Sequence, residues 1–355
     1  MQNKYKVALM LLSTLSAPVI AEKSGVSFTH KDWEVVCDNT LTCRAAGYGQ
    51  ENETGGSDGS VLLTREAGPG TAISADVVLA DIEDDDDDDS SSPPLSLWIN
   101  NQSAGNLSMT SEGDWRLSGS QTQALIDAIK GSGRVEFKGG TRSFVLSGDG
   151  AYAAMLKMDD VQGRIGTHGA LSKKGDKAES SVLAAIPAPV IQAVKVDKEQ
   201  IRPLTAPELA ALEPKLRATL NQDNVCDRLQ PSEDHDERSD EGITITPLDD
   251  KHALLSTLCW RAAYNEGYGY WVIDNALQEN PLLVTDSGTD YSDGTISMGQ
   301  KGRGLGDCWA TASWVWDGQH FRKSSESSTG MCRYIRLGGT WDLPTFVADV
   351  IKPAQ

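Results

Sequence analysis

The order of apolar and polar positions predicts a chain built mainly from short β-strands. In the first half, apolar and polar residues alternate in brief runs separated by Gly, Pro, Asn and Asp, which is typical of antiparallel strands. These runs are 61–65, 71–80, 95–100, 134–138 and 143–146. The second half continues over 243–246, 253–260, 268–274, 282–285, 295–298, 310–316 and 319–322. Asp317-Gly318, between the last two runs, predicts a two-residue hairpin turn.

Three segments instead carry the three- to four-residue apolar spacing of amphipathic helices. The first is predicted to begin at Ser120, which forms a capping box with Gln123, and to end at Gly131. The second covers about 149–162, and the third follows a capping box at 205–208. The expected inward faces are Leu125, Ala128 and Ile129; Ala151, Ala154, Met155, Met158 and Val161; and Leu209, Leu212, Leu216 and Leu220.

Strands with a few helices indicate an α+β fold of two mainly antiparallel β domains. Residues 171–205 are rich in Lys, Ser, Ala and Pro, a composition typical of a linker. The chain on either side is long enough for two separate cores. We therefore expect an N-terminal α+β domain over 22–170 and a C-terminal, mainly β domain over 206–355.

The start of the chain has the pattern of a cleavable secretory signal peptide over residues 1–21. Lys4 and Lys6 precede an apolar run over 7–15, and small side chains follow up to Ala21. That run is too short for a membrane-spanning helix, which needs about 20 residues. The first cysteine, Cys37, lies far from the cleavage site, so a lipid anchor is not expected. The pattern predicts an exported, soluble protein.

Export implies an oxidising compartment, in which cysteines tend to pair. The chain has six cysteines: Cys37, Cys43, Cys226, Cys259, Cys308 and Cys332. We favour pairing of neighbours, although the partners of the four cysteines in the second half stay open. The turn-forming residues 38–40 place the first two opposite each other in a hairpin. A zinc site would need further ligands, and redox pairs prefer C-x-x-C, so a disulfide is the favoured interpretation.

The formal net charge is −19, and removal of Lys4 and Lys6 with the signal peptide would make it −21. Such a surface repels phosphate backbones and anionic membranes, and it attracts cationic proteins or divalent ions. A simple need for solubility would also explain the high negative charge.

Two acidic stretches contain enough carboxylates to raise the question of a metal site. In the stretch 81–94, the six carboxylates of 84–89 repel one another and predict a solvated loop without the ordered oxygen spacing of a calcium site. The stretch 227–242 contains a single histidine, His235, which is a poor metal cage. Residues 289–294 also miss the calcium spacing and are interpreted as a turn. No metal or cofactor is predicted.

The segment 299–309, GQKGRGLGDCW, resembles a phosphate-binding loop only superficially. A strand follows it instead of a helix, so it is interpreted as a glycine-rich bend before a disulfide-tied strand. Arg303 and Asp307 are candidates for an exposed recognition point within it. Trp309, Trp314 and Trp316 are further candidate binding residues, with Trp314 and Trp316 on one face of a strand and Trp309 on the other. Core packing is the competing explanation for these aromatics.

The sequence contains no recognisable catalytic motif. A G-x-S-x-G elbow and an H-E-x-x-H helix are both missing, and paired cysteines would leave no free thiol. A carboxylate pair of the glycosidase type stays open, because only its spatial separation could identify it. The sequence therefore favours a non-catalytic protein and assigns no catalytic residue.

The chain resembles a known family of exported bacterial proteins of unknown function with six cysteines, DUF1176. The resemblance is carried by DWEVVCDNTLTCRAAGY, GAYAAMLKMDDVQGRIGTHGAL, GRGLGDCWATASWVWDG and MCRYIRLGGTWDLP. The first half also resembles invasion-associated locus B proteins in DWEVVC, LLTREAGPG and AYAAMLKMD, but it lacks their additional cysteine pair. The family resemblance implies an envelope location and disulfides, and it implies no activity.

Together these features favour a periplasmic binding protein whose partner is a protein or another envelope component. Two alternatives stay open: an inhibitor of cationic hydrolases such as lysozyme, and a carboxylate-based hydrolase. Nucleic acid and stable membrane insertion are not expected.

Overall fold

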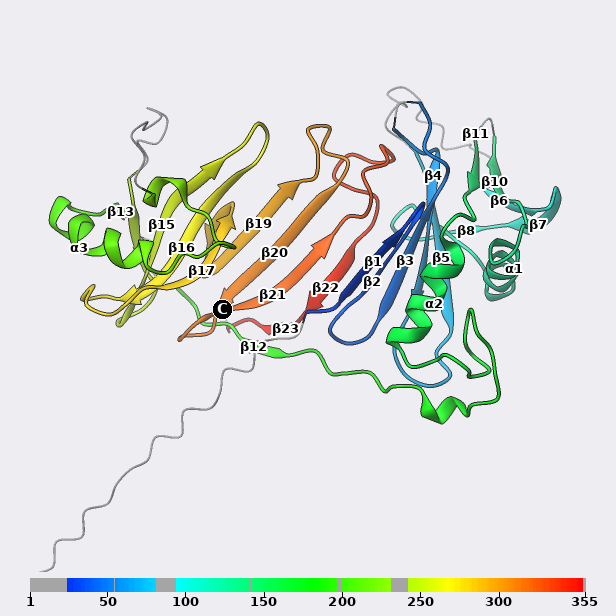
Figure 1. Ribbon diagram of the computed structural model, residues 1–355, viewed down its shortest axis with the longest axis horizontal. Coiled ribbons are helices and arrows are strands. Elements are labelled where there is room, and N and C mark those ends of the chain that lie inside the picture. The colour runs from blue at the N-terminus through cyan, green and yellow to red at the C-terminus, as the bar shows by residue number, and fades with distance from the viewer. Residues whose placement is uncertain are drawn as a thin grey trace, which may run out of the picture.

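The computed structural model describes residues 24–53, 55–80, 94–140, 142–196, 200–230 and 242–353. Within these ranges the chain forms mostly antiparallel β-sheets, three α-helices and three disulfides. The strands stand in a long row, with the first half of the chain at one end and the second half at the other (Figure 1). The predicted signal peptide, the acidic residues 81–93 and His235 lie outside the described residues.

Two sheets form the first half. A seven-stranded sheet has the order β1-β2-β3-β4-β5-β9-β8 and a four-stranded sheet the order β11-β10-β6-β7. The strands are β1 Val26–His30, β2 Trp33–Cys37, β3 Cys43–Tyr48, β4 Gly59–Arg65, β5 Ile73–Leu79, β6 Ser96–Ile99, β7 Gln102–Asn106, β8 Ser108–Met109, β9 Trp115–Arg116, β10 Val135–Gly139 and β11 Arg142–Leu146. Helix α1 (Gly119–Ile129) packs against β5, β6 and β10, and α2 (Ala151–Val161) packs against β1, β2 and β3. One apolar core lies between these layers.

Helix α1 corrects the prediction of its start. Its N-cap is Ser118, and the capping box is formed with Gln121, two residues before the predicted pair of Ser120 and Gln123. Helix α3 (Ala206–Arg217) has the predicted capping box between Thr205 and Glu208. A local Ser-x-x-Gln match thus predicts that a helix begins nearby but does not identify its first residue.

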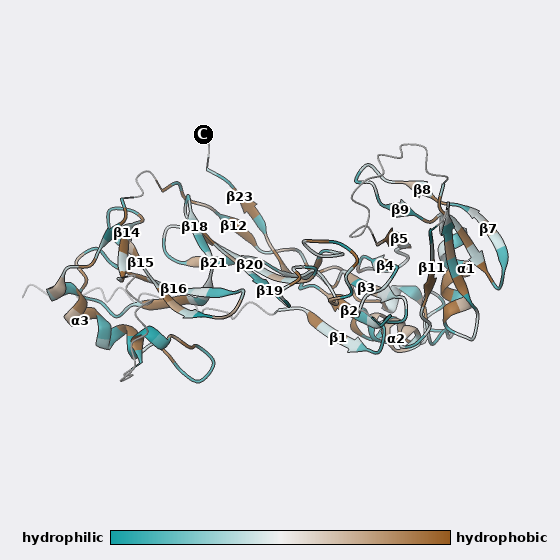
Figure 2. Cartoon of the chain, turned by 90° about the horizontal axis from the view of Figure 1, so that it is seen from above, coloured by the Kyte–Doolittle hydropathy of each residue, from teal (hydrophilic) through white to brown (hydrophobic). Residues whose placement is uncertain are grey.

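Two five-stranded sheets form the second half, in the orders β13-β14-β15-β16-β17 and β18-β19-β20-β21-β22. Their strands are β13 Arg202–Pro203, β14 Thr244–Pro247, β15 His252–Arg261, β16 Glu266–Asp274, β17 Leu282–Gly288, β18 Asp290–Ser292, β19 Thr295–Lys301, β20 Trp309–Trp316, β21 Phe321–Ser328 and β22 Leu343–Val347. Leu254, Tyr270, Ile296 and Trp316 belong to a core shared by the two sheets. Helix α3 contributes to a separate core with β15 and β16. Brown, apolar segments appear along strands of these sheets in Figure 2.

Two turns differ from their predictions. The stretch 289–294, interpreted as a turn, contains β18 and a two-residue hairpin in which Asp293 and Gly294 have φ angles of 48° and 73°. Positive φ at both positions is typical of a type I′ turn. The predicted two-residue turn at Asp317-Gly318 is wrong in length, since Trp316 pairs with Phe321 and four residues form the loop. Asp317 widens the turn because its Oδ1 accepts the backbone N–H groups of Gln319 and His320 at 2.8 and 2.7 Å.

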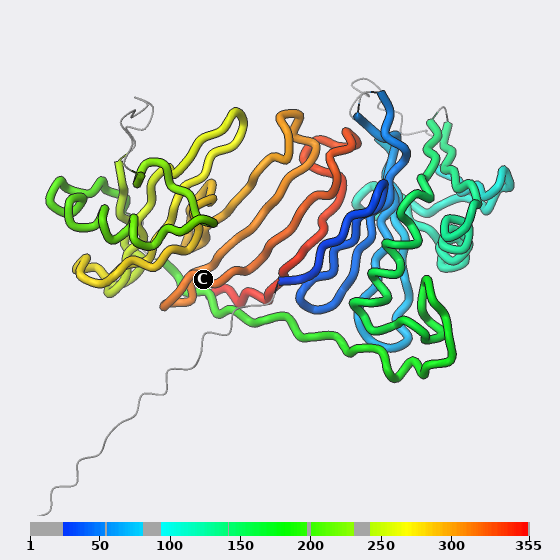
Figure 3. Tube along the Cα trace, in the orientation of Figure 1, coloured from blue at the N-terminus to red at the C-terminus, as the bar shows by residue number. Residues whose placement is uncertain are grey.

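The residues 171–205, predicted as a linker, cross from one half to the other along one edge of the molecule (Figure 3). They include a short 3₁₀ turn at Glu179–Ser181 and strand β12 (Val190–Gln192). Strand β12 pairs in parallel with β23 (Asp349–Ile351) near the end of the chain. Leu171, at the start of the segment, belongs to the first-half core.

The second half reaches back over the first through residues 329–347, here called the strap. Leu343 and Trp341 of the strap pack with Val36, Ala46 and Leu62 on the outer face of the seven-stranded sheet. The opposite face of these strands lines the first-half core. Burial on both faces explains why all five residues of β2, WEVVC, are buried and why Val35, Val36 and Cys37 follow one another without alternation.

The disulfides join Cys37 to Cys43, Cys226 to Cys259 and Cys308 to Cys332. These are the neighbouring pairs favoured from the sequence, and the described residues contain no free cysteine. Cys37 and Cys43 are directly opposed partners in β2 and β3, so the hairpin prediction is confirmed.

Candidate functional site

The five predicted binding residues separate into two groups at opposite ends of β20. Arg303 and Asp307 lie in the loop between β19 and β20, and Trp309 begins β20 directly after it. Trp314 and Trp316 lie at the other end of the same strand. The structure therefore does not bring all five residues into one site.

Arg303 and Asp307 form a structural ion pair. The Arg303 guanidinium donates to both carboxylate oxygens of Asp307, from Nε at 2.8 Å and from Nη2 at 2.6 Å. The backbone N–H of Tyr334 donates to the same carboxylate at 2.7 Å. Burial would raise the pKa of Asp307, but the hydrogen bonds from Arg303 and Tyr334 outweigh it and hold the pKa below its ordinary value. Asp307 is fully buried, which corrects the prediction that it is exposed, and only Arg303 of the pair is partly accessible.

The tryptophans have different surroundings. Trp316 is fully buried, with its ring 5.2 Å from that of Phe321 and 5.3 Å from that of His252. Trp314 packs against the same core on the same face. Trp309 is half-buried; its indole N–H donates to the carbonyl of Gly306 at 2.9 Å, and the Lys301 ammonium lies 5.4 Å from its ring. Trp316 is therefore a core residue, whereas Trp309 supports the loop that precedes it.

Three exposed apolar side chains lie on this loop and on two neighbouring loops, and we call them the crest surface. Tyr264, Leu305 and Leu337 are 47%, 55% and 68% exposed. A Cβ atom placed on Gly304 would lie 3.5 Å from the Tyr264 ring, and Gly338 donates its N–H to the carbonyl of Gly306 at 2.9 Å. The loops that carry the three side chains therefore touch, and they lie along the upper edge of the sheets in Figure 1.

The loops of the crest are held in place by covalent and polar contacts. The disulfide between Cys308 and Cys332 joins the β19–β20 loop to the strap. The Asn265 amide brackets the backbone of Lys301, donating to its carbonyl and accepting from its N–H, each at 2.9 Å. The crest side chains are thus exposed on a fixed backbone.

Leu305 and Leu337 are not among the binding residues expected from the sequence. A signal was nevertheless present, because both leucines lie beside glycines, in Gly-Leu-Gly and Leu-Gly-Gly. Gly306, Gly338 and Gly339 have positive φ angles of 73°, 83° and 112°, which strain any other residue. A large apolar residue in such a glycine turn has few neighbours to cover it.

A buried polar cluster connects the strap to the first half. One carboxylate oxygen of Glu34 accepts the Tyr48 hydroxyl at 2.6 Å and the backbone N–H of Met331 at 2.7 Å. Arg333 pairs with Asp32 at 3.1 Å and with Glu51 at 2.8 Å. Burial raises the pKa of Glu34, although the hydrogen bonds from Tyr48 and Met331 oppose it. A carboxyl with a raised pKa suits general acid catalysis, but this one is sealed within the contact between the halves.

A polar pocket of about 630 Å³ lies between two similar turns at the other end of β20. Each turn has an aspartate three residues before a histidine, Asp249 with His252 and Asp317 with His320. Each aspartate Oδ1 accepts two backbone N–H groups of its own turn. In the described ranges no three His, Cys, Asp or Glu side chains are arranged to hold a metal ion. The turn aspartates therefore serve mainly to fix the turns.

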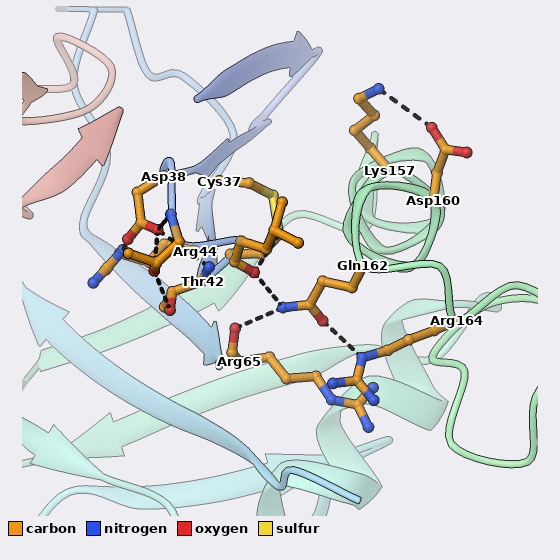
Figure 4. The surroundings of a disulfide bond; sticks show 12 residues. Cys37, Asp38, Thr42, Arg44, Arg65, Lys157, Asp160, Gln162 and Arg164 are labelled. Atoms are coloured by element: carbon orange, nitrogen blue, oxygen red, sulfur yellow. Dashed lines mark hydrogen bonds and ion pairs between the residues drawn. A yellow bond between two sulfur atoms is a disulfide. The ribbon is translucent and has the colours of Figure 1, made fainter. Parts of the chain in front are cut away.

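The first disulfide lies in a network of buried polar groups (Figure 4). The Gln162 amide donates to the carbonyls of Leu41 and Arg65, each at 2.9 Å, and accepts from Arg164 at 2.7 Å. Arg164 is fully buried, and desolvation lowers its pKa to about 10. Because these groups bond to one another and to the backbone, the network ties α2 to the β2–β3 hairpin.

None of the helices in the described ranges has the length and apolar content that crossing a membrane requires. Residues 27–348 match the family described as "Protein of unknown function (DUF1176)". The uncharacterized protein YpfG of Escherichia coli (strain K12) is 26% identical over 340 residues, which cover 90% of this chain and 92% of that protein. No solved structure matches the chain significantly. Since the family match covers most of the chain and agrees with the resemblance seen in the sequence, the chain belongs to the DUF1176 family.

Proposed function

We propose that this chain is a non-catalytic binding protein of the bacterial periplasm that contacts a protein partner through the crest surface. Export is supported by the signal-peptide pattern of residues 1–21 and by three disulfides, which form and persist in oxidising compartments. In this proposal the N-terminal domain, 22–170, and the C-terminal domain, 206–355, are joined by the linker 171–205. Separate apolar cores on the two sides of the linker support that division.

The observation that carries the proposal is the exposure of Tyr264, Leu305 and Leu337 on a fixed backbone. Exposed apolar side chains that lie together mark contact sites more often than isolated ones do. A fixed backbone lowers the entropic cost of binding, because the loops are already ordered before the partner arrives. Arg303 lies in the same loop as Leu305, and Trp309 directly follows that loop. Both would form part of the same contact, with the partly exposed Arg303 at its polar rim.

The carboxylate hydrolase has less support than a binding role. Glu34 has the raised pKa expected of a catalytic acid, yet Tyr48 and Met331 bond to it where the two halves meet. The hydrolase inhibitor remains compatible with the binding role, since a cationic enzyme would be attracted by a net charge of −19.

Site-specific photo-crosslinking in the periplasm tests the proposal. A photoreactive phenylalanine analogue replaces Leu337 in one strain and Leu282 in another. Leu282 is a matched control, because it is 54% exposed but lies on β17, away from the crest. We expect a discrete covalent adduct from position 337 and none from position 282. The adduct at 337 should disappear when Leu305→Glu is added, since a carboxylate beside the contact would have to be desolvated.

The proposal is wrong if both positions give the same adducts, or if Leu305→Glu leaves the adduct at 337 unchanged. Repeating the crosslinking in periplasmic extract at rising ionic strength separates two kinds of partner. An adduct that fades with salt indicates a cationic protein, as the inhibitor interpretation requires, and one that persists indicates an apolar contact.

A further inference from the structure

A second pocket lies where the linker, the end of the chain and the β18–β19 hairpin meet. Its volume is about 640 Å³, within the range of small-molecule sites. Valines form much of its wall: Val194 and Val196 of the linker, Val315 of β20 and Val350 of β23. Figure 2 shows β12 and β23 side by side beside the sheet that contains β20.

Backbone hydrogen bonds shape the pocket before any ligand is present. Strand β12 pairs with β23 through Ile191 and Val350. Just after β12, the Ala193 N–H donates to the carbonyl of Ile351 at 2.9 Å, and the Val194 N–H donates to the carbonyl of Trp316 at 3.0 Å. The linker is thereby fixed between β23 and the end of β20, so its valines have a defined position.

The valines are only partly covered. Val196 and Val315 are buried, whereas Val194 is 40% exposed and Val350 is half-buried. Apolar surface thus remains open to water inside a concave site. Filling it with an aliphatic chain would be favourable, because apolar surface of both the valines and the chain would be removed from water.

The charges around the pocket favour an anionic head group. Lys195, Lys352 and Asp293 line it, an excess of one positive charge on a chain whose formal net charge is −19. Lys195 and Asp293 have other polar interactions. Lys352 is exposed, and among the described residues it has no hydrogen-bond or ion-pair partner. Its ammonium group is therefore available to an anion whose apolar part enters between the valines.

We propose that this pocket binds an amphiphilic monoanion with one aliphatic chain, either a fatty acid or a lysophospholipid. The chain lies between Val194, Val315 and Val350, and the carboxylate or phosphate lies against Lys352. This site is separate from the crest surface, so it does not depend on the proposed protein contact.

Isothermal titration calorimetry of the full chain with dodecanoate, below its micellar concentration, tests the site. We expect saturable binding at one site per chain and binding weaker by roughly tenfold or more for the cationic dodecyltrimethylammonium. Hexanoate, which has the same head group and a shorter chain, should also bind less tightly. Lysophosphatidylglycerol is titrated in the same way, and its dissociation constant is compared with that of dodecanoate. The ligand class whose probe binds more tightly, lysophospholipid or fatty acid, is the natural one.

Two variants assign the binding to this pocket. Val350→Trp fills the cavity and Lys352→Glu reverses the charge at its mouth, and each should weaken dodecanoate binding at least roughly tenfold. Lys174→Glu, at an exposed position near the start of the linker, is the charge-matched control and should bind as the parent does. Lys352→Glu changes an exposed side chain and so tests the site even if Val350→Trp fails to fold. The proposal is overturned if no ligand binds saturably, or if Lys352→Glu and Lys174→Glu bind dodecanoate equally well.

Discussion

Replacing Leu343 by alanine should destabilise the contact between the two halves. Leu343 is fully buried, and it packs with Val36 and Ala46 of the seven-stranded sheet while it also begins β22. Removing three carbons loses about 2.4 kcal/mol at about 0.8 kcal/mol for each buried group. The cavity left behind raises the cost, so we expect the free energy of unfolding to fall by about 3 kcal/mol.

Hydrogen exchange measured by mass spectrometry locates the loss. In the Leu343→Ala variant, the backbone amides of β2 and β3 should exchange faster, although the substitution lies about 300 residues away in the sequence. Leu212→Ala is the matched control, because Leu212 is equally buried but belongs to the core around α3. It should cost a similar free energy without changing exchange in β2 and β3. If Leu343→Ala leaves exchange in these strands unchanged, the strap does not stabilise the first half and our interpretation of the contact is wrong.

Three further predictions follow from individual residues. Ser118→Ala should lower the free energy of unfolding by about 1 kcal/mol through loss of the α1 cap, whereas Ser120→Ala should change it little; equal effects in urea denaturation would contradict the assigned N-cap. Burial raises the pKa of Glu34 above its ordinary value of 4.5, so the folded state binds this proton more tightly than the unfolded state does. The stabilisation from the protonated Glu34 is therefore lost as the pH rises from about 4.5 through the raised pKa. The Glu34→Gln variant keeps an acceptor for Tyr48 and Met331, so it should gain stability relative to the parent over that pH range, and a constant difference would contradict this. Asp307→Asn should cost about 2 kcal/mol and speed amide exchange in the β19–β20 loop, because it weakens a buried charged hydrogen-bond network; unchanged exchange there would show that the disulfide alone holds the loop.

Strand patterning predicted most of the β-structure, because each of these strands has its own local apolar signal. The first residue of α1, in contrast, could not be predicted from local sequence. Ser118-x-x-Gln121 and Ser120-x-x-Gln123 both fit a capping box, and nothing local distinguishes them. In the structure, Gln121 Nε2 also donates to the carbonyls of Ala104 and Asn106, each at 3.1 Å, at the edge of β7. That tertiary contact favours the earlier start, and it depends on a strand that the alternation did not reveal.

The candidate site was predicted only in part for a similar reason. The segment 299–309 was interpreted as a glycine-rich bend leading into a disulfide-tied strand, which holds for 302–308, whereas 299–301 belong to β19. The exposure of Asp307 was predicted wrongly, because its partner Tyr334 lies 27 residues further along the chain. Sequence spacing gave no indication that the strap folds back onto this loop. Leu337 became a candidate only when its neighbours were known.

The strap connects the proposed binding surface to the contact between the halves. Within it, Leu337 lies on the crest, while Arg336 next to it pairs with Asp114 of the first half at 2.8 Å. Four residues later the Trp341 indole donates to the Ser60 hydroxyl at 2.8 Å. Both of these attachments to the first half add to the disulfide with Cys308 in holding Leu337 in place. A partner that binds Leu337 in this position therefore stabilises the docked halves, and loosening the halves weakens the binding by the same free energy.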